Sequence, residues 1–254
     1  MYARLKAIVD DRREAIERTD FSSLPTGSGA ARRDFRAALM TRSRSIIAEI
    51  KRRSPSAGAL REQIDAAALA RSYETAGAAA LSVLTEEAHF GGSLEDLIAA
   101  RDAVSIPVLR KDFILDRRQL RETKVCGADA VLLIARILED QLGGFVDEAL
   151  ELGVEPLVEV HDASDLAYAL ATRCRVIGVN NRDLDSFTID LTTSLRLLPS
   201  IPNNRLRIVE SGLRSVEDLE TMERAGFDAA LIGSALVTAD HPEAALAQLT
   251  QVAS

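Results

Sequence analysis

The chain has 254 residues, of which 47% are hydrophobic and 28% charged, and its formal net charge is −8. A chain of this length buries enough apolar surface for one hydrophobic core without support from disulfides or metal ions. The acidic balance argues against a nucleic-acid or anionic-membrane surface, because either would require an excess of Lys and Arg. It does not argue against local binding of a small anion.

The predicted compartment and partners follow from what the chain lacks. The first 20 residues are charged throughout, and no run approaches the roughly 18 apolar residues of a membrane-spanning helix. We therefore expect a cytoplasmic protein without membrane or nucleic-acid partners. Cys126 and Cys174 lie far apart and lack metal-type spacing, so we expect two reduced structural thiols. No metal site is expected, and a structural or surface role is assigned to His89, His161 and His241.

Residues 1–44 precede the first predicted strand. They contain a helical pattern over 2–17, a loop rich in Ser, Gly and Pro over 21–29, and a second helical pattern over 31–40. No linker-like change of composition follows. We therefore predict a single domain, in which residues 1–44 form a helical extension that packs on residues 45–254.

Eight short apolar runs recur along the rest of the chain, and a longer stretch follows each. Most runs are apolar at nearly every position, which is typical of parallel strands covered on both faces. The longer stretches have helical periodicity, and several open on a capping residue such as Ser93 or Ser215 and close on Gly77, Gly127 or Gly226. The predicted strands are 45–50, 79–84, 107–110, 129–134, 155–160, 176–180, 207–210 and 228–232, and the predicted helices include 64–74, 94–103, 138–152, 163–171 and 216–225.

This alternation predicts an α/β fold, a single (β/α)₈ TIM barrel. An open doubly wound sheet is the alternative, but it often carries a glycine-rich dinucleotide turn, and the chain contains no GxGxxG motif. In a barrel, catalytic and binding residues gather where the strands meet the loops that follow them.

Charged or amide side chains stand at five of the predicted strand ends. Glu49 and Lys51 end the first strand with i, i+2 spacing, which places them on the same face. A single pair of this kind is often a structural salt bridge, but five converging ends are hard to explain by packing. The candidate polar residues are Glu49, Lys51, Lys111, Glu159, Asn180, Arg182 and Glu210.

The last two strand ends indicate a phosphate site. Ser211-Gly212 and Gly233-Ser234 follow the seventh and eighth strands, where barrels frequently bind phosphate, and glycine lets backbone N–H groups approach an anion. The alternative is that these glycines only make tight turns. The apolar residues expected near the same face, where they would clamp a flat ring, are Pro55, Phe90, Phe113, Leu132 and Leu184, of which Phe113 and Leu132 also suit an ordinary core.

These segments resemble indole-3-glycerol phosphate synthases, enzymes of tryptophan biosynthesis. The matching segments run in the family's order and are IIAEIKRRSPSAG (46–58), ALSVLTEEAHFGGS (80–93), PVLRKDFI (107–114), GADAVLLI (127–134), LVEVH (157–161), IGVNNRDL (177–184), IVESG (208–212) and LIGSAL (231–236). The resemblance implies a substrate in which an anthranilate ring is joined through nitrogen to deoxyribulose 5-phosphate. It also implies a carboxy-lyase reaction that closes the indole ring with loss of carbon dioxide and water and needs no cofactor.

The resemblance implies a role for each candidate. Lys111 resembles the general acid that protonates the ketone oxygen, and Glu159 the acid/base partner in dehydration. If Glu159 is buried against the apolar wall, desolvation is expected to raise its pKa toward neutrality. Lys51 would hold the substrate carboxylate, although spacing leaves open which lysine serves which step. Glu49 and Glu210 would orient the lysines and substrate hydroxyls. The remaining assignments are Asn180 and Arg182 at the carboxylate and ring nitrogen, Ser54, Ser211, Gly212, Gly233 and Ser234 at the phosphate, and Pro55, Phe90, Phe113, Leu132 and Leu184 around the ring.

The chain departs from the family pattern at Arg117-Arg118, where a proline and an aromatic residue are usual. Two other functions stay open. A sister barrel such as phosphoribosylanthranilate isomerase would use a Cys/Asp pair, yet neither cysteine falls at a suitable strand end. A non-catalytic phosphate-ligand binder would be expected to lack Lys111 or Glu159, and both are present. We expect a monomer, with a weak homodimer as the alternative.

Overall fold

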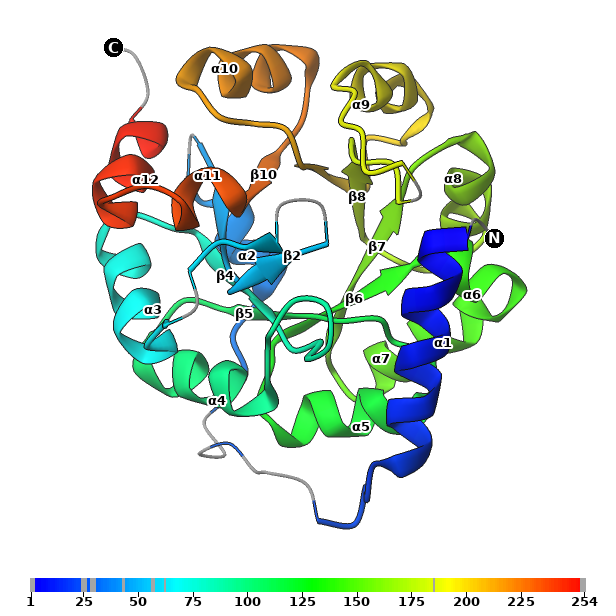
Figure 1. Ribbon diagram of the computed structural model, residues 1–254. Coiled ribbons are helices and arrows are strands. Elements are labelled where there is room, and N and C mark those ends of the chain that lie inside the picture. Colours follow the sequence, from blue (N-terminus) through cyan, green and yellow to red (C-terminus); the bar gives the residue numbers. More distant parts are fainter. Residues whose placement is uncertain are drawn as a thin grey trace.

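Eight parallel strands close into a barrel in the order β1-β10-β9-β8-β7-β6-β5-β4. The computed structural model describes residues 3–23, 27, 31–42, 44–55, 58–61, 63–184 and 186–251. The strands are β1 Ile46–Ile50, β4 Ala80–Leu84, β5 Val108–Lys111, β6 Ala130–Ile134, β7 Glu155–Val160, β8 Val176–Asn180, β9 Leu206–Glu210 and β10 Ala229–Ile232. All eight predicted strands are confirmed to within one residue at each end, and so is the TIM-barrel fold (Figure 1).

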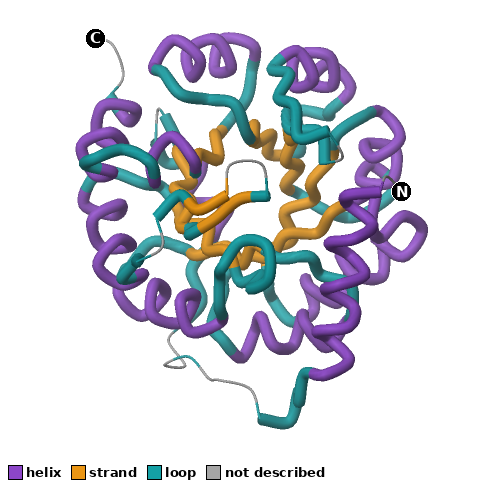
Figure 2. Tube along the Cα trace, viewed as in Figure 1, coloured by secondary structure: helices purple, strands orange, loops and turns teal. Residues whose placement is uncertain are grey.

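A ring of helices surrounds the strands, as Figure 2 shows. Asp65, Ser93, Asp116, Asp162 and Ser215 each cap a helix by accepting a hydrogen bond from a backbone N–H of its first turn. The helices of this ring are α3 Ala66–Thr75, α4 Leu94–Ala103, α5 Arg117–Val125, α6 Ala135–Leu138, α7 Leu142–Glu151, α8 Ala163–Leu170, α9 Thr192–Leu197, α10 Val216–Ala225, α11 Ser234–Val237 and α12 Pro242–Thr250. None of the helices in the described ranges is long and apolar enough to cross a membrane.

The single helix predicted over 138–152 is wrong. The chain forms α6, then a 3₁₀ turn at Glu139–Gln141, and then α7. The backbone of Glu139 has a φ of 46°, which lies outside the right-handed helical region and ends α6 there. Because Leu138 and Leu142 are both buried on either side of the break, the apolar pattern continues and reads as one helix.

The barrel strands are buried on both faces, and their side chains alternate between two cores. In β6, Val131 and Leu133 point outward and pack beneath the helices, whereas Ala130, Leu132 and Ile134 fill the barrel interior. This two-sided burial explains why the strands appear in the sequence as continuous apolar runs.

Two helices precede the barrel. They are α1 Ala3–Arg18, dark blue in Figure 1, and α2 Phe35–Met40. The helix predicted over 31–40 begins only at Phe35, because the Asp34 carboxylate caps it by accepting from the backbone N–H of Ala37. Most of the predicted loop over 21–29 lies outside the described residues.

The N-terminal helices share a core with the barrel interior. Leu5 and Val9 of α1 and Phe35 and Leu39 of α2 are buried in the same cluster as the inward-facing strand residues. Burial of this apolar surface stabilises the contact between the helices and the barrel, since each fully buried Leu or Phe contributes about 1.5–3 kcal/mol.

A short antiparallel hairpin after β1 is absent from the predicted elements. Its strands are β2 Arg53–Ser54 and β3 Gly58–Ala59, with Arg53 opposite Ala59 and Ser54 opposite Gly58. Strands of two residues are too short for an alternating pattern. The hairpin carries Ser54 and Pro55 to the mouth of the barrel.

Candidate active site

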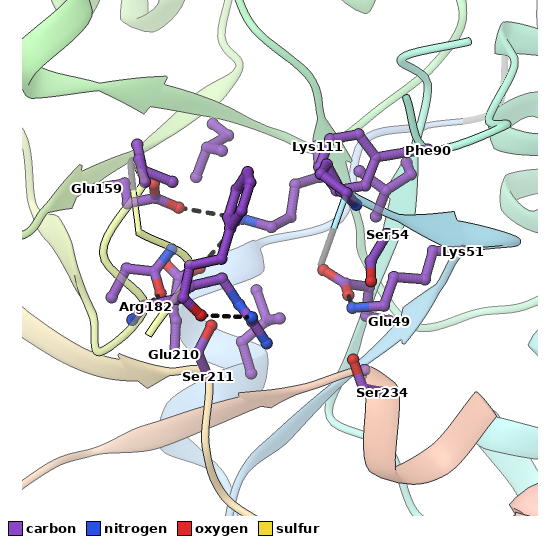
Figure 3. A pocket seen from close by; sticks show the side chains of 18 of the residues that line it. Glu49, Lys51, Ser54, Phe90, Lys111, Glu159, Arg182, Glu210, Ser211 and Ser234 are labelled. Atoms are coloured by element: carbon purple, nitrogen blue, oxygen red, sulfur yellow. Dashed lines mark hydrogen bonds and ion pairs between the residues drawn. The ribbon is translucent and has the colours of Figure 1, made fainter. Parts of the chain in front are cut away.

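An open cavity lies at the C-terminal ends of the barrel strands, and its volume is about 1150 Å³ when the open space at its mouth is included. All seventeen candidate residues predicted from the sequence line it. They come from β1, the β2–β3 hairpin and the loops or ends of every later barrel strand, and ten of the side chains that line the cavity are labelled in Figure 3. The structure therefore brings the predicted site together in one place.

The Lys111 ammonium lies at the centre of this cavity, between two carboxylates. Its Nζ is 3.1 Å from Glu159 Oε2 and 3.1 Å from Glu210 Oε2 (Figure 3). Burial disfavours the charged amine, but Glu159, Glu210 and Glu49 outweigh burial and raise the pKa of Lys111. Lys111 is therefore protonated at neutral pH in the empty site, as a general acid must be.

The two carboxylates around Lys111 differ in protonation. The expectation of a raised pKa for Glu159 is wrong: burial alone would raise it, but Lys111 and His161 lower it. Burial raises the pKa of Glu210 to about 7 against the opposing charge of Lys111, and the charge of Glu159 adds to the rise. The surroundings thus favour the charged form of Glu159, whereas burial favours the neutral form of Glu210.

Glu210 reaches Lys111 because the neighbouring strand leaves room for it. Gly178 lies on β8, and a Cβ at this position would be 2.2 Å from Glu210 Oε1, closer than any packing allows. The absence of a side chain at position 178 therefore sets the position of the Glu210 carboxyl.

A second ion pair stands beside the first. Lys51 Nζ lies 2.6 Å from Glu49 Oε1, as the i, i+2 spacing predicts. Gly233, after β10, makes space for the pair, since a Cβ there would lie 2.1 Å from Glu49 Oε1 and 2.9 Å from Lys51 Nζ. The glycine assigned to a phosphate site thus also accommodates this ion pair.

The loop after β9 has an unusual backbone. Ser211 and Gly212 have φ angles of 65° and 91°, and a left-handed conformation is uncommon for serine. Asn181 holds the loop, because its Nδ2 donates to the Ser211 carbonyl at 3.1 Å while its Oδ1 accepts from Ser194 Oγ at 2.7 Å. Sequence reasoning missed Asn181, whose role depends on contacts between loops that no local pattern reveals.

Asn180 and Arg182 bind within their own loop. Asn180 Oδ1 accepts from the backbone N–H of Arg182 at 3.0 Å, and Arg182 Nη1 donates to the Phe187 carbonyl at 3.1 Å. These bonds fix the turn after β8 and leave both residues lining the cavity, together with Ser54 and Ser234 across it.

An apolar wall covers one part of the cavity. The rings of Phe90 and Phe113 lie 6.2 Å apart between centroids, and Leu132 and Leu184 line the same space. Phe113 and Leu132 belong to the buried core and also line the cavity, so each contributes to the core and to the site. Apolar lining residues absent from the sequence-based list are Leu5, Ile8, Leu84, Ile134, Phe187, Ile189, Leu213, Leu231, Ile232 and Ala235.

The helical pattern of α1 was the one signal that pointed to Leu5 and Ile8, although it does not show which surface the helix covers. Neither cysteine contributes to the cavity: Cys126 and Cys174 are buried free thiols. Across the ranges that the structure describes, no three His, Cys, Asp or Glu side chains are grouped to hold a metal ion.

Comparison with known proteins identifies the family. The family model described as indole-3-glycerol phosphate synthase matches residues 1–249. The chain belongs to this family. Its relatives include the indole-3-glycerol phosphate synthase of Koribacter versatilis (strain Ellin345), 44% identical over 260 residues that cover 98% of this chain and 99% of that protein. The namesake from Kineococcus radiotolerans is 50% identical over 205 residues, covering 80% and 75%.

Family membership confirms the predicted class of enzyme, a decarboxylating lyase of tryptophan biosynthesis that acts on a small molecule. Two solved structures show the fold alone. A structure described as native KDPGal has a TM-score of 0.58 and 16% identity, covering 81% of this chain and 90% of that chain. An N-acetylmannosamine-6-phosphate 2-epimerase from Clostridium perfringens has a TM-score of 0.60 and 14% identity, covering 82% and 93%.

Proposed function

We propose that the protein converts 1-(2-carboxyphenylamino)-1-deoxyribulose 5-phosphate to indole-3-glycerol phosphate with the residues that meet at the barrel mouth. One observation carries the assignment of roles. The Lys111 ammonium, within 3.1 Å of both Glu159 and Glu210, stands in a cavity with apolar walls and serine- and glycine-bearing loops. A ligand with a flat ring, a ketone and a phosphate matches these three kinds of surface.

Ring closure is assigned to Lys111. The ring carbon that carries the carboxylate attacks the ketone carbon, and Lys111 donates a proton to the ketone oxygen as its negative charge develops. Carbon dioxide then leaves, and the electrons of the broken carbon–carbon bond restore the aromatic ring. Lys51, paired with Glu49, is assigned to the substrate carboxylate.

Dehydration is assigned to Glu159. The hydroxyl formed from the ketone leaves as water when it receives a proton, and a base takes a proton from the substrate to complete the double bond of the indole. Glu159 is ionised in the empty site because Lys111 and His161 lower its pKa, so it begins as the base. Glu49 and Glu210 are assigned to orient Lys51 and Lys111.

The remaining side chains are assigned to binding. The empty polar site sets three cations against the carboxylates of Glu49 and Glu159 and the Glu210 carboxyl, whose pKa is raised to about 7, so it has no excess of negative charge before a substrate with a phosphate and a carboxylate enters. The assignments are Asn180 and Arg182 at the carboxylate and ring nitrogen, Ser54, Ser211, Gly212, Gly233 and Ser234 at the phosphate, and Pro55, Phe90, Phe113, Leu132 and Leu184 around the ring.

The test is a fluorescence assay for indole formation with wild-type protein, Lys111→Ala and the control Lys124→Ala. Loss of the acid is expected to lower kcat by about 10²–10⁴, whereas a purely binding role would raise KM and leave kcat intact. Lys124 is an exposed lysine of α5 and should turn over like wild type. An unchanged kcat in Lys111→Ala would refute the assignment, and a wild-type protein that forms no indole would refute the activity.

We further propose that the protein works in the cytoplasm, without a cofactor and without nucleic-acid or membrane partners. Its net charge of −8 supports the absence of nucleic-acid and anionic-membrane partners. A monomer is proposed, with a weak homodimer as the alternative, and light scattering across a range of protein concentrations distinguishes the two.

A further inference from the structure

A buried histidine continues the line of charged groups from Glu159 away from the cavity. His161 directly follows β7 and is 7% exposed. Its Nε2 lies 3.3 Å from Glu159 Oε1, while the other carboxylate oxygen, Oε2, lies 3.1 Å from Lys111 Nζ. Glu159 thus directs one oxygen at the reaction chamber and the other at His161.

The opposite edge of the His161 ring is fixed by Asp165 of α8. Asp165 Oδ2 accepts from the His161 backbone N–H at 2.9 Å and lies 3.1 Å from His161 Nδ1. The same oxygen accepts from Arg136 Nε at 2.8 Å, and Arg136 Nη2 donates to Asp162 Oδ2 at 2.8 Å. Because Asp165 is itself buried and held by a second helix, the imidazole has one defined orientation.

This arrangement determines the charge on the ring. Each ring nitrogen lies near a carboxylate oxygen: Nδ1 is within hydrogen-bonding distance of Asp165, and Nε2 lies 3.3 Å from Glu159 as an ion-pair contact outside hydrogen-bond geometry. Two carboxylates beside one buried ring favour the imidazolium. The charged groups around it are Glu159 on β7, Asp165 on α8 and Arg136 on α6, with Lys111 beyond Glu159. Burial and Arg136 oppose the positive charge, but the two carboxylates outweigh them and raise the pKa of His161.

We propose that His161 is a positioning residue, an imidazolium clamped by Asp165 that keeps Glu159 ionised and turned toward Lys111. This inference rests on the proposed role of Glu159 as the base in dehydration. His161 does not line the cavity and does not need to touch substrate. It acts by supplying the second of two cationic neighbours that Glu159 requires to stay charged in a buried setting.

Two substitutions separate orientation from charge. In His161→Asn the amide replaces Nδ1 and keeps the contact with Asp165, but nothing reaches Glu159. In His161→Gln the longer amide places a neutral donor near the position of Nε2, where it meets Glu159. The matched control is His241→Asn, because His241 is exposed and does not line the cavity.

The expected result is a graded loss. His161→Asn should lower kcat by about tenfold with KM changed less than about twofold, and should move the acid limb of the kcat–pH profile to higher pH, since one pKa unit is a tenfold change in ionisation. His161→Gln should recover much of kcat and keep a shifted acid limb, because orientation is restored without charge. His241→Asn should match wild type in rate and profile.

Several results would overturn the inference: wild-type kcat and pH profile in His161→Asn, a change confined to KM, or no difference between the Asn and Gln variants. Melting curves show whether the variants fold. If they do not, ¹⁵N NMR of the wild-type protein decides, because the chain has only three histidines. Protonation of both ring nitrogens of His161 at pH 7.5 supports the imidazolium, and a neutral ring overturns it.

Failure of this inference and failure of the proposed function give different results. If Lys111→Ala loses activity while His161→Asn retains it, only the role of His161 fails. If the wild-type protein forms no indole, the proposed function fails, and the NMR measurement still reports the charge on the ring.

Discussion

Two glycines decide where the carboxylates of the site stand. Gly178 gives room to Glu210, and Gly233 gives room to Glu49. Neither glycine supplies a functional group, and neither is required here for a positive φ. Their contribution is the space in which a carboxylate approaches a lysine at hydrogen-bonding distance.

Gly178→Ala should therefore impair catalysis more than folding. The new Cβ would lie 2.2 Å from Glu210 Oε1 and 2.8 Å from Leu157 Cδ2, so the carboxylate must leave Lys111. We expect kcat to fall by about 10²-fold, the order of effect of a 1 Å misplacement, with a loss of stability of about 1–3 kcal/mol.

Steady-state kinetics and urea unfolding test this prediction, with Gly143→Ala of α7 as the control. Nothing lies within 4 Å of a Cβ at position 143, so this variant should keep wild-type kcat and gain slightly in stability. Equal kcat values for Gly178→Ala and wild type would contradict the argument.

The candidate site was predictable because its polar residues stand at strand ends, where an apolar run stops at Glu49, Lys111 or Glu159. The supporting residues were not. His161 and Asn181 lie beside predicted site residues, but their partners come from other elements, Asp165 of α8 and the loop after β9. The raised pKa was likewise assigned to Glu159 and not to Glu210. The pKa of each glutamate depends on which cations lie beside it, and Glu159 has both Lys111 and His161 whereas Glu210 has Lys111 alone.

At the scale of elements, α1 is tied to the strand that carries Lys111. Arg12 Nη2 lies 2.7 Å from Asp112 Oδ2, and Asp112 directly follows Lys111. The same carboxylate accepts from Thr85 Oγ1 at 2.6 Å and from Arg110 Nη2 at 3.0 Å. Leu5 and Ile8 of α1 also line the cavity. The Arg12–Asp112 ion pair therefore links the part of the cavity wall that α1 supplies to Lys111, the proposed general acid.

Arg12→Ala should weaken both stability and substrate binding. It leaves the buried Asp112 with one cation fewer, at a cost of about 1–3 kcal/mol, and loosens the cavity wall that α1 supplies, which raises KM more than it lowers kcat. Urea unfolding and steady-state kinetics measure the two effects.

Arg13→Ala is the matched control, because Arg13 is exposed and pairs with Asp10 at 3.5 Å; its change in stability should stay below about 1 kcal/mol. We propose that residues 1–44 and 45–254 form one domain, so wild type should unfold in a single transition. Separate transitions for the two parts, or equal behaviour of the two arginine variants, would count against this view.

The strands were predictable as elements because burial on both faces makes them apolar throughout. The helix over 138–152 was not, because burial of Leu138 and Leu142 hides the break at Glu139. The β2–β3 hairpin was missed for the opposite reason: strands of two residues are too short to carry an apolar pattern.

For the whole molecule, the perturbed groups predict how stability varies with pH. The raised pKa of Glu210, about 7 against 4.5, means that the folded protein keeps a proton that the unfolded chain has released, so stability falls as pH rises between these values. The raised pKa of His161 continues the fall above 6.5. The lowered pKa values of Asp112 and Asp165 act oppositely: their contribution is present above 3.8 and is lost as pH falls further.

The free energy of unfolding should therefore be greatest at about pH 4–5 and decline toward pH 8. Urea unfolding across this range measures it, and Glu210→Gln should flatten the decline because the titrating carboxyl is gone. A free energy of unfolding that climbs steadily from pH 5 to pH 8 would show that these two groups do not govern the profile.

Closure of the barrel has a consequence for synthesis. β1 is hydrogen-bonded to β10, with Ala48 opposite Ile232, so the seam joins the earliest strand to the last. A chain still emerging from the ribosome holds Glu49 and Lys51 long before Gly233 arrives to enclose them. The nascent polypeptide must keep its first strand unpaired on one edge until translation is almost finished, and the complete set of site residues comes together only then.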